Sequence, residues 1–484
     1  MSNSAAAIAS RTLSASGYKR CVLVIVDGAR PDVFRYLLRR GRLPGIQEHL
    51  LDRGVFLDAV TSFPSTTGPA YVPFVMGCYP GTVGVPGIRW MDKTRLGRRE
   101  PGWRRSYMGY EALFFNRDLD GSRRTLFEYF EHPVNILNMV TKGLRRGGNA
   151  SRCTRPALYA LAHFTELWGL VDRAAGWHLL RALRNPRNDL IVAVFPGVDA
   201  FAHRSHPFEP RVLRAYEWVD TVIGEACRLL QRRGEYEQTL WFVVSDHGLS
   251  WTHSHLDLVD FLDRRGYRAL DYPRVYRRRA RAAVMISGNA MANVYFQNSR
   301  GWLAPTYRQD LDRDDGELLL SLVERPEVDI LAIRDYRGGI HVMSERGVAN
   351  IAFEDGLIRY TPLVGDPFGY DHLPERFTWR QSLELTLATD YPDAPAQLLQ
   401  LFRTRRAGDL LVSAARGCDL RANYEWPTHC ASHGALIREQ MAVPIISNHP
   451  IPDIPARTAD VFPTLLALMG RPLPANIDGV SLVD

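Results

Sequence analysis

The stretch CVLVIVDG, residues 21–28, decides the fold class. It is a continuous apolar run rich in valine and isoleucine, which is typical of a strand buried on both faces of a parallel sheet. Two similar runs follow, LIVAVF at 190–195 and LWFVV at 240–244. Between these last two runs, apolar residues recur with helical spacing at 211–232. The pattern predicts an α/β fold with a mostly parallel central sheet flanked by helices.

Each of these three predicted strands ends close to a candidate metal ligand. Asp27 follows the first strand directly, Asp199 lies just beyond the second, and Asp246 with His247 lies just beyond the third. Because ligands bind at the carboxyl ends of strands in open α/β sheets, we expect these side chains to converge at one edge. His203 comes one helical turn after Asp199, so this pair is expected to face the same side and to bind one ion together.

Two adjacent threonines, Thr66 and Thr67, precede a predicted helix in FPSTTGPAYVPFVMGCYPG, residues 63–81. Metal coordination can activate a hydroxyl as a nucleophile, and a helix N-terminus offers backbone N–H groups to phosphoryl oxygens. Mixed Asp and His ligands without thiolate suit zinc or manganese. Two such ions about 3.5–4 Å apart can clamp both oxygens of an in-line displacement. Each motif alone is common, since adjacent threonines also serve as helix N-caps.

Together these motifs resemble those of the alkaline phosphatase superfamily, specifically its nucleotide pyrophosphatase/phosphodiesterase (type I phosphodiesterase) family. The resemblance covers about 20–90, 188–255 and 408–484, roughly half of the chain. The stretches that carry it are DGARPD (27–32), the threonine stretch at 63–81, PGVDAFAHRSHP (196–207), SDHG (245–248), SHGALIREQMAVPII (432–446) and the closing TADVFPTLLALMGRPLPANIDGVSL (458–482).

The resemblance implies a site with two divalent ions, zinc or alternatively manganese, and a threonine nucleophile. Counting back from Gly77 selects Thr67 rather than Thr66, and Thr67 is expected to form a covalent phosphothreonine intermediate. The implied ligands are Asp27, Thr67, Asp246 and His247 for one ion, and Asp199, His203 and His433 for the other. His429 and His206 are reserve ligands.

The sequence departs from the family pattern after the nucleophile helix. Ile88 stands near the position of an asparagine that commonly binds a phosphoryl oxygen, and Val83 replaces a usual histidine. Arg89 is a candidate for the missing phosphate contact, with a structural role as the alternative. His253 and His255 either line the leaving-group pocket or have structural roles.

Two stretches are predicted to be insertions into the α/β core. The first, 132–187, is helical and arginine-rich, and its apolar face is more typical of packing than of membrane binding. The second, 251–405, alternates short strand-like runs with turns and predicts an α+β cap subdomain over the site. The core is then assigned to the remaining segments, 18–131, 188–250 and 406–484.

Composition sets broad limits on partners and location. The net charge of +7 and pI of about 9.1 suit an anionic substrate. Arginine clusters such as 104–105 and 277–279 lack the aromatic interleaving of a nucleic-acid surface, so no stable nucleic-acid partner is expected. The six cysteines form no CxxC pair and predict no disulfide framework. Residues 1–20 contain no signal-peptide-like or membrane-spanning run, which makes the cytoplasm the default expectation.

Three functions remain open at this point. The leading hypothesis is hydrolysis of a phosphodiester or pyrophosphate bond. A phosphomonoesterase on the same scaffold is the alternative, and an inactive metal-binding scaffold is the third. Sulfatase chemistry is disfavoured, because that branch requires a cysteine or serine in a C/S-x-P-x-R motif, which the sequence lacks.

Overall fold

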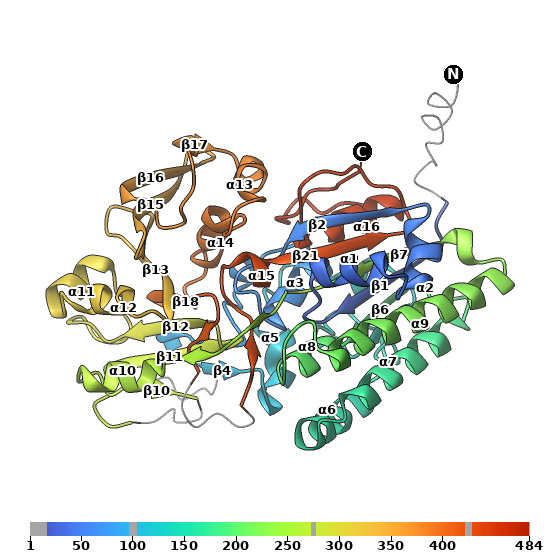
Figure 1. Cartoon of the computed structure of the whole chain (residues 1–484), viewed down its shortest axis with the longest axis horizontal. Coiled ribbons are helices and arrows are strands. Elements are labelled where there is room, and N and C mark those ends of the chain that lie inside the picture. The colour runs from blue at the N-terminus through green and yellow to red at the C-terminus, as the bar shows by residue number, and fades with distance from the viewer. Residues whose placement is uncertain (1–16, 96–103, 273–276, 422–427, 484) are drawn as a thin grey trace.

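The computed structural model describes residues 17–95, 104–272, 277–421 and 428–483. The chain forms two large β-sheets, each with its own hydrophobic core (Figure 1). The first sheet has the strand order β22-β2-β21-β7-β1-β6-β5. Its strands are β1 (Arg20–Val26), β2 (Val55–Val60), β5 (Pro133–Ile136), β6 (Leu190–Phe195), β7 (Thr239–Val244), β21 (Ala442–Ser447) and β22 (Ala456–Arg457).

β1 lies at the centre of the parallel part of this sheet. It pairs in parallel with β6 and with β7, and β5 extends the parallel arrangement beyond β6. β21 runs antiparallel to both of its neighbours, β2 and β7. Every residue of β1, β6 and β7 is buried, which explains why their sequences are apolar runs rather than alternating patterns. The predicted α/β class with a mostly parallel central sheet is confirmed.

The three central strands end almost level with one another. Val26 of β1 lies opposite Phe195 of β6, and Ile25 lies opposite Val244 of β7. The segments that follow these strands therefore leave the sheet at the same edge.

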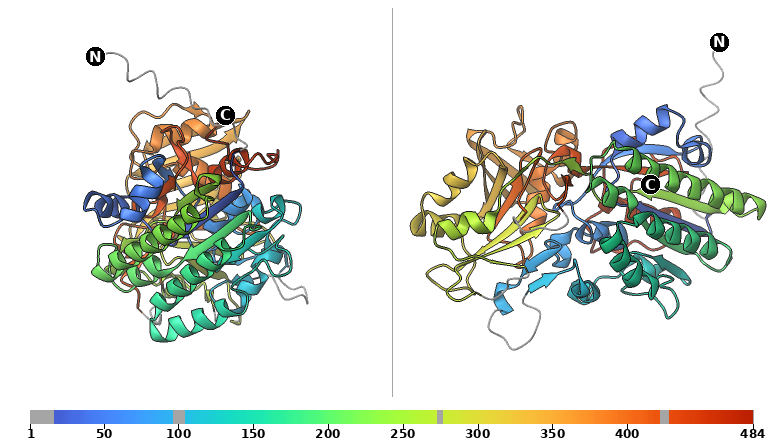
Figure 2. Two further views of the ribbon diagram at one scale, coloured as in Figure 1. Left: turned by 90° about the vertical axis from the view of Figure 1, so that its right-hand side faces the viewer. Right: turned by 60° about the horizontal axis from the view of Figure 1, so that its bottom comes forward.

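Helices cover the first sheet. α9 packs against α7 and α8, and also against α1 and α2, while α3 packs against α16 (Figures 1 and 2). Their bounds are α1 (Pro31–Arg39), α2 (Pro44–Ile46), α3 (Val72–Met76), α7 (Trp168–Leu183), α8 (Gly197–Ala202), α9 (Pro210–Arg232) and α16 (Val461–Leu468). Among the described residues, no helix has both the length and the apolar character needed to cross a membrane.

The second sheet has the order β10-β11-β12-β18-β13-β14-β15-β16-β17 and is mostly antiparallel. Its strands are β10 (Leu270–Asp271), β11 (Ala282–Ser287), β12 (Met291–Phe296), β13 (Val328–Arg334), β14 (Ile340–Ser344), β15 (Gly347–Glu354), β16 (Leu357–Gly365), β17 (Arg376–Phe377) and β18 (Leu410–Ala414). The helices of this half are α10 (Leu258–Arg264), α11 (Arg308–Asp314), α12 (Leu318–Val323), α13 (Trp379–Thr386) and α14 (Ala394–Leu401).

Two strands belong to a different sheet from the one that the predicted segments imply. β5 lies within the predicted helical segment 132–187, yet it forms an edge of the first sheet. β18 lies within the predicted core segment 406–484, yet it pairs with β12 and β13 in the second sheet. The division of the chain into five segments therefore remains a prediction.

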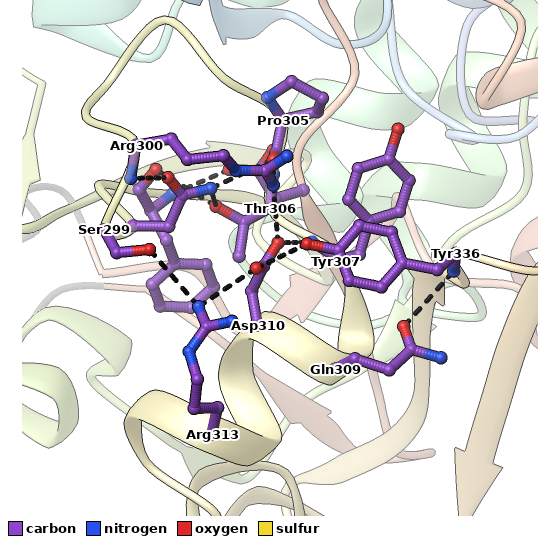
Figure 3. Close-up of polar contacts among 12 residues, drawn as sticks. Ser299, Arg300, Pro305, Thr306, Tyr307, Gln309, Asp310, Arg313 and Tyr336 are labelled. Atoms are coloured by element: carbon purple, nitrogen blue, oxygen red, sulfur yellow. Dashed lines mark hydrogen bonds and ion pairs between the residues drawn. The ribbon is translucent and has the colours of Figure 1, made fainter.

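A buried acid holds the loop before α11 in the second half. Asp310 accepts hydrogen bonds from Arg300 at 2.8 Å, from Arg313 at 3.1 Å and from the Tyr336 hydroxyl at 2.6 Å (Figure 3). It also accepts from the backbone N–H of Tyr307 at 3.1 Å, which caps the helix. Because its charge is matched by these partners, we interpret this cluster as structural.

A buried ion pair joins the two halves. Arg457 on β22 of the first sheet donates two hydrogen bonds, both 2.7 Å, to Asp393, which precedes α14. Both side chains are almost fully buried. Breaking such a pair by removing one partner leaves an uncompensated buried charge.

We therefore expect Arg457→Met to destabilise the protein by about 3–5 kcal/mol, because the Asp393 carboxylate loses its cation inside the fold. Thermal and urea unfolding measure this. The matched control is Arg53→Met, which removes an exposed pair with Glu237 at 2.8 Å and should cost at most about 1 kcal/mol. An equal decrease in the free energy of unfolding in the two variants would contradict the role given to Arg457.

Candidate functional site

The edge where the central strands end brings three carboxylates together. Asp27 follows β1, Asp199 lies in the first turn of α8, and Asp246 follows β7. The backbone N–H of Asp199 donates to the carbonyl of Asp27 at 3.0 Å. Gly28, with a φ of 72°, allows this approach, because a Cβ at that position would lie only 2.8 Å from the Cβ of Asp199. A glycine is therefore required where the two segments touch.

One group of ligand atoms consists of Asp27, Asp246 and His247. The Nε2 atom of His247 lies 3.4 Å from Asp27 Oδ1 and 3.3 Å from Asp246 Oδ2. The three ligand atoms lie within 4.8 Å of one another, and all three residues are buried.

Thr67 lies directly beside this group. Its hydroxyl Oγ1 is 3.3 Å from Asp27 Oδ1 and 3.0 Å from His247 Nε2. Thr66, by contrast, is completely buried, and its hydroxyl has no hydrogen-bond partner in the described structure. Of the two adjacent threonines, Thr67 is the one whose hydroxyl contacts the carboxylate and imidazole atoms.

A second group consists of Asp199, His203 and His433. His203 Nε2 lies 3.3 Å from Asp199 Oδ1, and His433 Nε2 lies 3.9 Å from the same oxygen. The two groups are adjacent, since the rings of His247 and His433 stack with centroids 3.8 Å apart. The structure thus brings together all seven residues that the sequence predicted as ligands, in the predicted two sets.

Backbone carbonyls orient the three imidazoles. The Nδ1 atom of His203 bonds to the carbonyl of Ala431 at 2.8 Å, that of His247 to Gly248 at 2.9 Å, and that of His433 to Ser65 at 3.0 Å. A carbonyl can only accept, so each Nδ1 carries the proton. When the ring is neutral, its Nε2 then has a lone pair available for a metal ion, as in histidines that bind metals.

Carboxylate crowding dominates the electrostatics. Burial, together with the charges of Asp246 and Asp199, raises the pKa of Asp27 well above its ordinary value. Burial and the Asp199 charge raise the pKa of Asp246 to about 8. Burial also disfavours the charged form of Asp199, but the imidazoles of His203 and His433 outweigh it and lower its pKa. The three groups can ionise together only if positive charge enters the site.

The unsatisfied oxygens of this cluster fit divalent cations. Asp199 Oδ1 and Asp246 Oδ2 are buried and accept no hydrogen bond within the described residues. A buried carboxylate oxygen without a donor is costly, and a cation would compensate it. Carboxylate and imidazole donors without thiolate suit zinc or manganese.

The two reserve ligands have different surroundings. The ring of His429 lies 4.5 Å from that of His203, and burial lowers its pKa to about 3. His206 is exposed, and its Nδ1 accepts a hydrogen bond from the backbone N–H of Phe208 at 3.2 Å.

The remaining predicted residues make contacts outside the cluster. Arg89 Nε donates to the Ser106 hydroxyl at 3.3 Å, and its guanidinium lies 5.9 Å from the centre of the Tyr272 ring. His255 pairs with Asp419 at 2.9 Å. Neither of these two contacts involves a ligand residue, and the role of Arg89 in phosphate binding stays a prediction.

Sequence reasoning missed several residues that hold the cluster in place. The Tyr71 hydroxyl donates to Asp27 Oδ2 at 2.6 Å. Gln397 on α14 accepts from the backbone N–H of Phe63 at 2.9 Å, and Gln400 donates to the carbonyl of the same residue. Tyr71 lies four residues after Thr67, but Gly68 between them has a φ of 92°, so helical spacing does not connect the two. The glutamines carry no local signal, since they are over three hundred residues away from the loop they bind.

Two related proteins align with about half of this chain. An uncharacterized pyrophosphatase/phosphodiesterase of Schizosaccharomyces pombe is 26% identical over 242 residues, which are 48% of this chain and 45% of the relative. GPI ethanolamine phosphate transferase 1 of Emericella nidulans is 24% identical over 257 residues, 49% of this chain and 26% of the relative. The chain thus matches less than half of the length of either protein.

Two solved structures share the fold over almost their whole length. Phosphonoacetate hydrolase from Sinorhizobium meliloti superposes with a TM-score of 0.57 at 16% identity, covering 93% of this chain and 96% of that one. Murine ectonucleotide pyrophosphatase/phosphodiesterase 5 gives a TM-score of 0.58 at 13% identity, covering 95% and 97%. The sequence profile of the type I phosphodiesterase/nucleotide pyrophosphatase family matches residues 21–436. The chain therefore belongs to the type I phosphodiesterase/nucleotide pyrophosphatase family.

Proposed function

We propose that this protein is a metal-dependent phosphoester hydrolase that cleaves diester or pyrophosphate bonds with Thr67 as its nucleophile. One observation carries the proposal: the Thr67 hydroxyl contacts both Asp27 and His247 at the border of two adjacent carboxylate–imidazole groups. A merely structural threonine needs neither a crowded carboxylate cluster nor two adjacent groups of carboxylate and imidazole atoms beside it.

The residues that would hold the ions follow from the two groups. Asp27, Asp246 and His247, together with the Thr67 hydroxyl, would bind one divalent ion. Asp199, His203 and His433 would bind the other. Zinc suits this donor set, with manganese as the alternative. When bound, such ions lower the pKa of a coordinated hydroxyl and neutralise charge on the phosphoryl oxygens.

The chemistry divides into two displacements at phosphorus. Thr67 Oγ1 would attack phosphorus while the bond to the leaving oxygen breaks, which gives a phosphothreonine ester. Water would then attack the same phosphorus, release the phosphate product and restore the hydroxyl. The Nδ1–carbonyl bonds of the histidines would keep the site in one geometry through both steps.

Proteins of similar fold support this chemistry. The murine protein has a solved structure of an inactive threonine-to-alanine variant in complex with AMP, a phosphate monoester. The Sinorhizobium meliloti hydrolase has been solved with phosphonoacetate and with phosphonoformate, both anions that contain phosphorus. We therefore infer that the substrate of this chain is also an anion that contains phosphorus.

We expect Thr67→Ala to reduce kcat/KM on bis-p-nitrophenyl phosphate by about a thousandfold or more, because the nucleophilic oxygen is removed. Zinc content, measured on the same sample, should persist, since six of the seven ligand residues remain. Thr66→Ala is the matched control and should retain activity within about tenfold. The assignment is wrong if Thr67→Ala stays fully active or if Thr66→Ala is the variant that fails.

Removing divalent ions with a chelator should abolish turnover and lower the melting temperature. The physical reason is the cost of three crowded carboxylates without cations, Asp27, Asp199 and Asp246. A ligand present at a hundred times its dissociation constant stabilises the folded protein by about 2.7 kcal/mol. We expect the melting temperature to recover by a corresponding amount when zinc or manganese is added back. Unchanged activity and melting after chelation would contradict the metal sites.

The substrate class is tested by comparing p-nitrophenyl phosphate with bis-p-nitrophenyl phosphate. We expect the diester to give the higher kcat/KM, as the family membership suggests. Ile88 is buried and has no side-chain amide to donate to a phosphoryl oxygen, which is why the monoesterase alternative stays open. A clear preference for the monoester would replace the phosphodiesterase assignment, and inactivity on both in metal-loaded protein would favour the inactive scaffold.

A further inference from the structure

An exposed apolar surface lies on α6 (Thr154–Thr165) and α7, remote in sequence from the ligand residues. The sequence pattern of this segment favoured packing of its apolar face, but the structure leaves much of that face uncovered. We call it the α6–α7 surface. Its large apolar side chains are Leu161, Phe164, Leu167, Leu170 and Trp177, all of them exposed.

On α6 the exposed side chains share the outer side of the helix. Leu161 and Phe164 are three residues apart and therefore neighbours on the helix surface, and Phe164 is 79% exposed. Ala162 faces the opposite way and is buried in the core. α6 packs on α7 and lies at the periphery of the molecule (Figures 1 and 2).

On α7 the same division holds. Leu170 and Trp177 are two turns apart on one side and are exposed, whereas Val171 and Leu179 are completely buried. The guanidinium of Arg181, one turn further on, lies 5.2 Å from the centre of the Trp177 ring. The outer side of α7 therefore passes from apolar to cationic along the helix.

The charged side chains of residues 152–187 are mostly arginines. The two acids between residues 152 and 187 do not offset them. Asp172 is buried and accepts from the backbone N–H of Gly197 at 3.0 Å, and burial raises its pKa to about 7. Glu166 is paired with Arg204 at 2.7 Å. The exposed arginines of the same stretch are Arg152, Arg173, Arg181, Arg184 and Arg187.

We propose that the α6–α7 surface binds the interface of a membrane that contains anionic lipid. Leucine, phenylalanine and tryptophan side chains flanked by arginines are the composition of helices that lie in the headgroup region of a bilayer. The apolar side chains enter the acyl boundary, and the guanidiniums contact lipid phosphates. A second copy of this chain fits less well, because a symmetric contact would bring the same arginines face to face.

Co-sedimentation of the metal-loaded full chain with vesicles tests this. Vesicles of phosphatidylcholine alone and of phosphatidylcholine mixed with phosphatidylglycerol are compared at low and high salt. We expect binding to the mixed vesicles, weakened by salt, and little binding to the neutral ones. Phe164→Glu should reduce partitioning by roughly tenfold or more, because an apolar ring is replaced by a negative charge that the anionic vesicle repels.

The matched control is Val364→Glu, which places the same charge on an apolar side chain that is 72% exposed on β16 in the other half of the molecule. It should bind vesicles as the unmodified chain does. The double variant Arg181→Gln, Arg184→Gln should lose the preference for anionic vesicles while circular dichroism remains unchanged.

Three results would overturn the proposal. The first is no binding of the unmodified chain to mixed vesicles. The second is an equal loss of vesicle binding in Phe164→Glu and Val364→Glu. The third is a dimer, seen by light scattering, that Phe164→Glu converts to a monomer while no vesicle binding is detected, which would assign the surface to a second copy. Because no readout is enzymatic, failure of the proposed hydrolase activity leaves this test unaffected.

Discussion

Three carboxylates, those of Asp27, Asp199 and Asp246, share one buried corner of the protein, and this crowding is the constraint that the rest of the site satisfies. The register of β1, β6 and β7 forces the segments that carry them to leave the sheet together. Like charges in a buried place raise one another's pKa values and destabilise the ionised state. Imidazoles reduce part of this cost, and two oxygens accept no hydrogen bond from the residues that the structure describes. Divalent cations would compensate the remaining charge, and the same cations would activate Thr67.

Both halves of the molecule contribute to holding this corner. The loop before Thr67 is fixed by Gln397 and Gln400 of α14, which belongs to the second half. Asp393 at the start of the same helix accepts a hydrogen bond from Gln397 and pairs with Arg457 of the first sheet. The β11–β12 turn also touches the site, where a Cβ on Gly288 would lie 2.5 Å from the His433 ring. The second half therefore helps to position the site.

The sequence predicted the features that local patterns encode. Apolar runs revealed the parallel strands, and because strand ends gather at one edge, the positions of Asp27, Asp199 and Asp246 implied their meeting. The contacts of Tyr71 and of the α14 glutamines were not predicted, because tertiary packing rather than sequence spacing determines their partners. The exposure of Phe164 was also missed, because an amphipathic pattern cannot say whether the apolar side finds a partner. The metal and catalytic roles of the ligand residues remain predictions, although their convergence is observed.

The central claim is that two cations bind beside Thr67, and a zinc titration of metal-free protein tests it most directly. The account predicts that two equivalents bind to the unmodified chain, one for each group of ligand atoms. It also predicts that a variant with both His203→Ala and His433→Ala retains only the equivalent held by Asp27, Asp246 and His247. A single equivalent in the unmodified chain, or the same stoichiometry in both proteins, would contradict it.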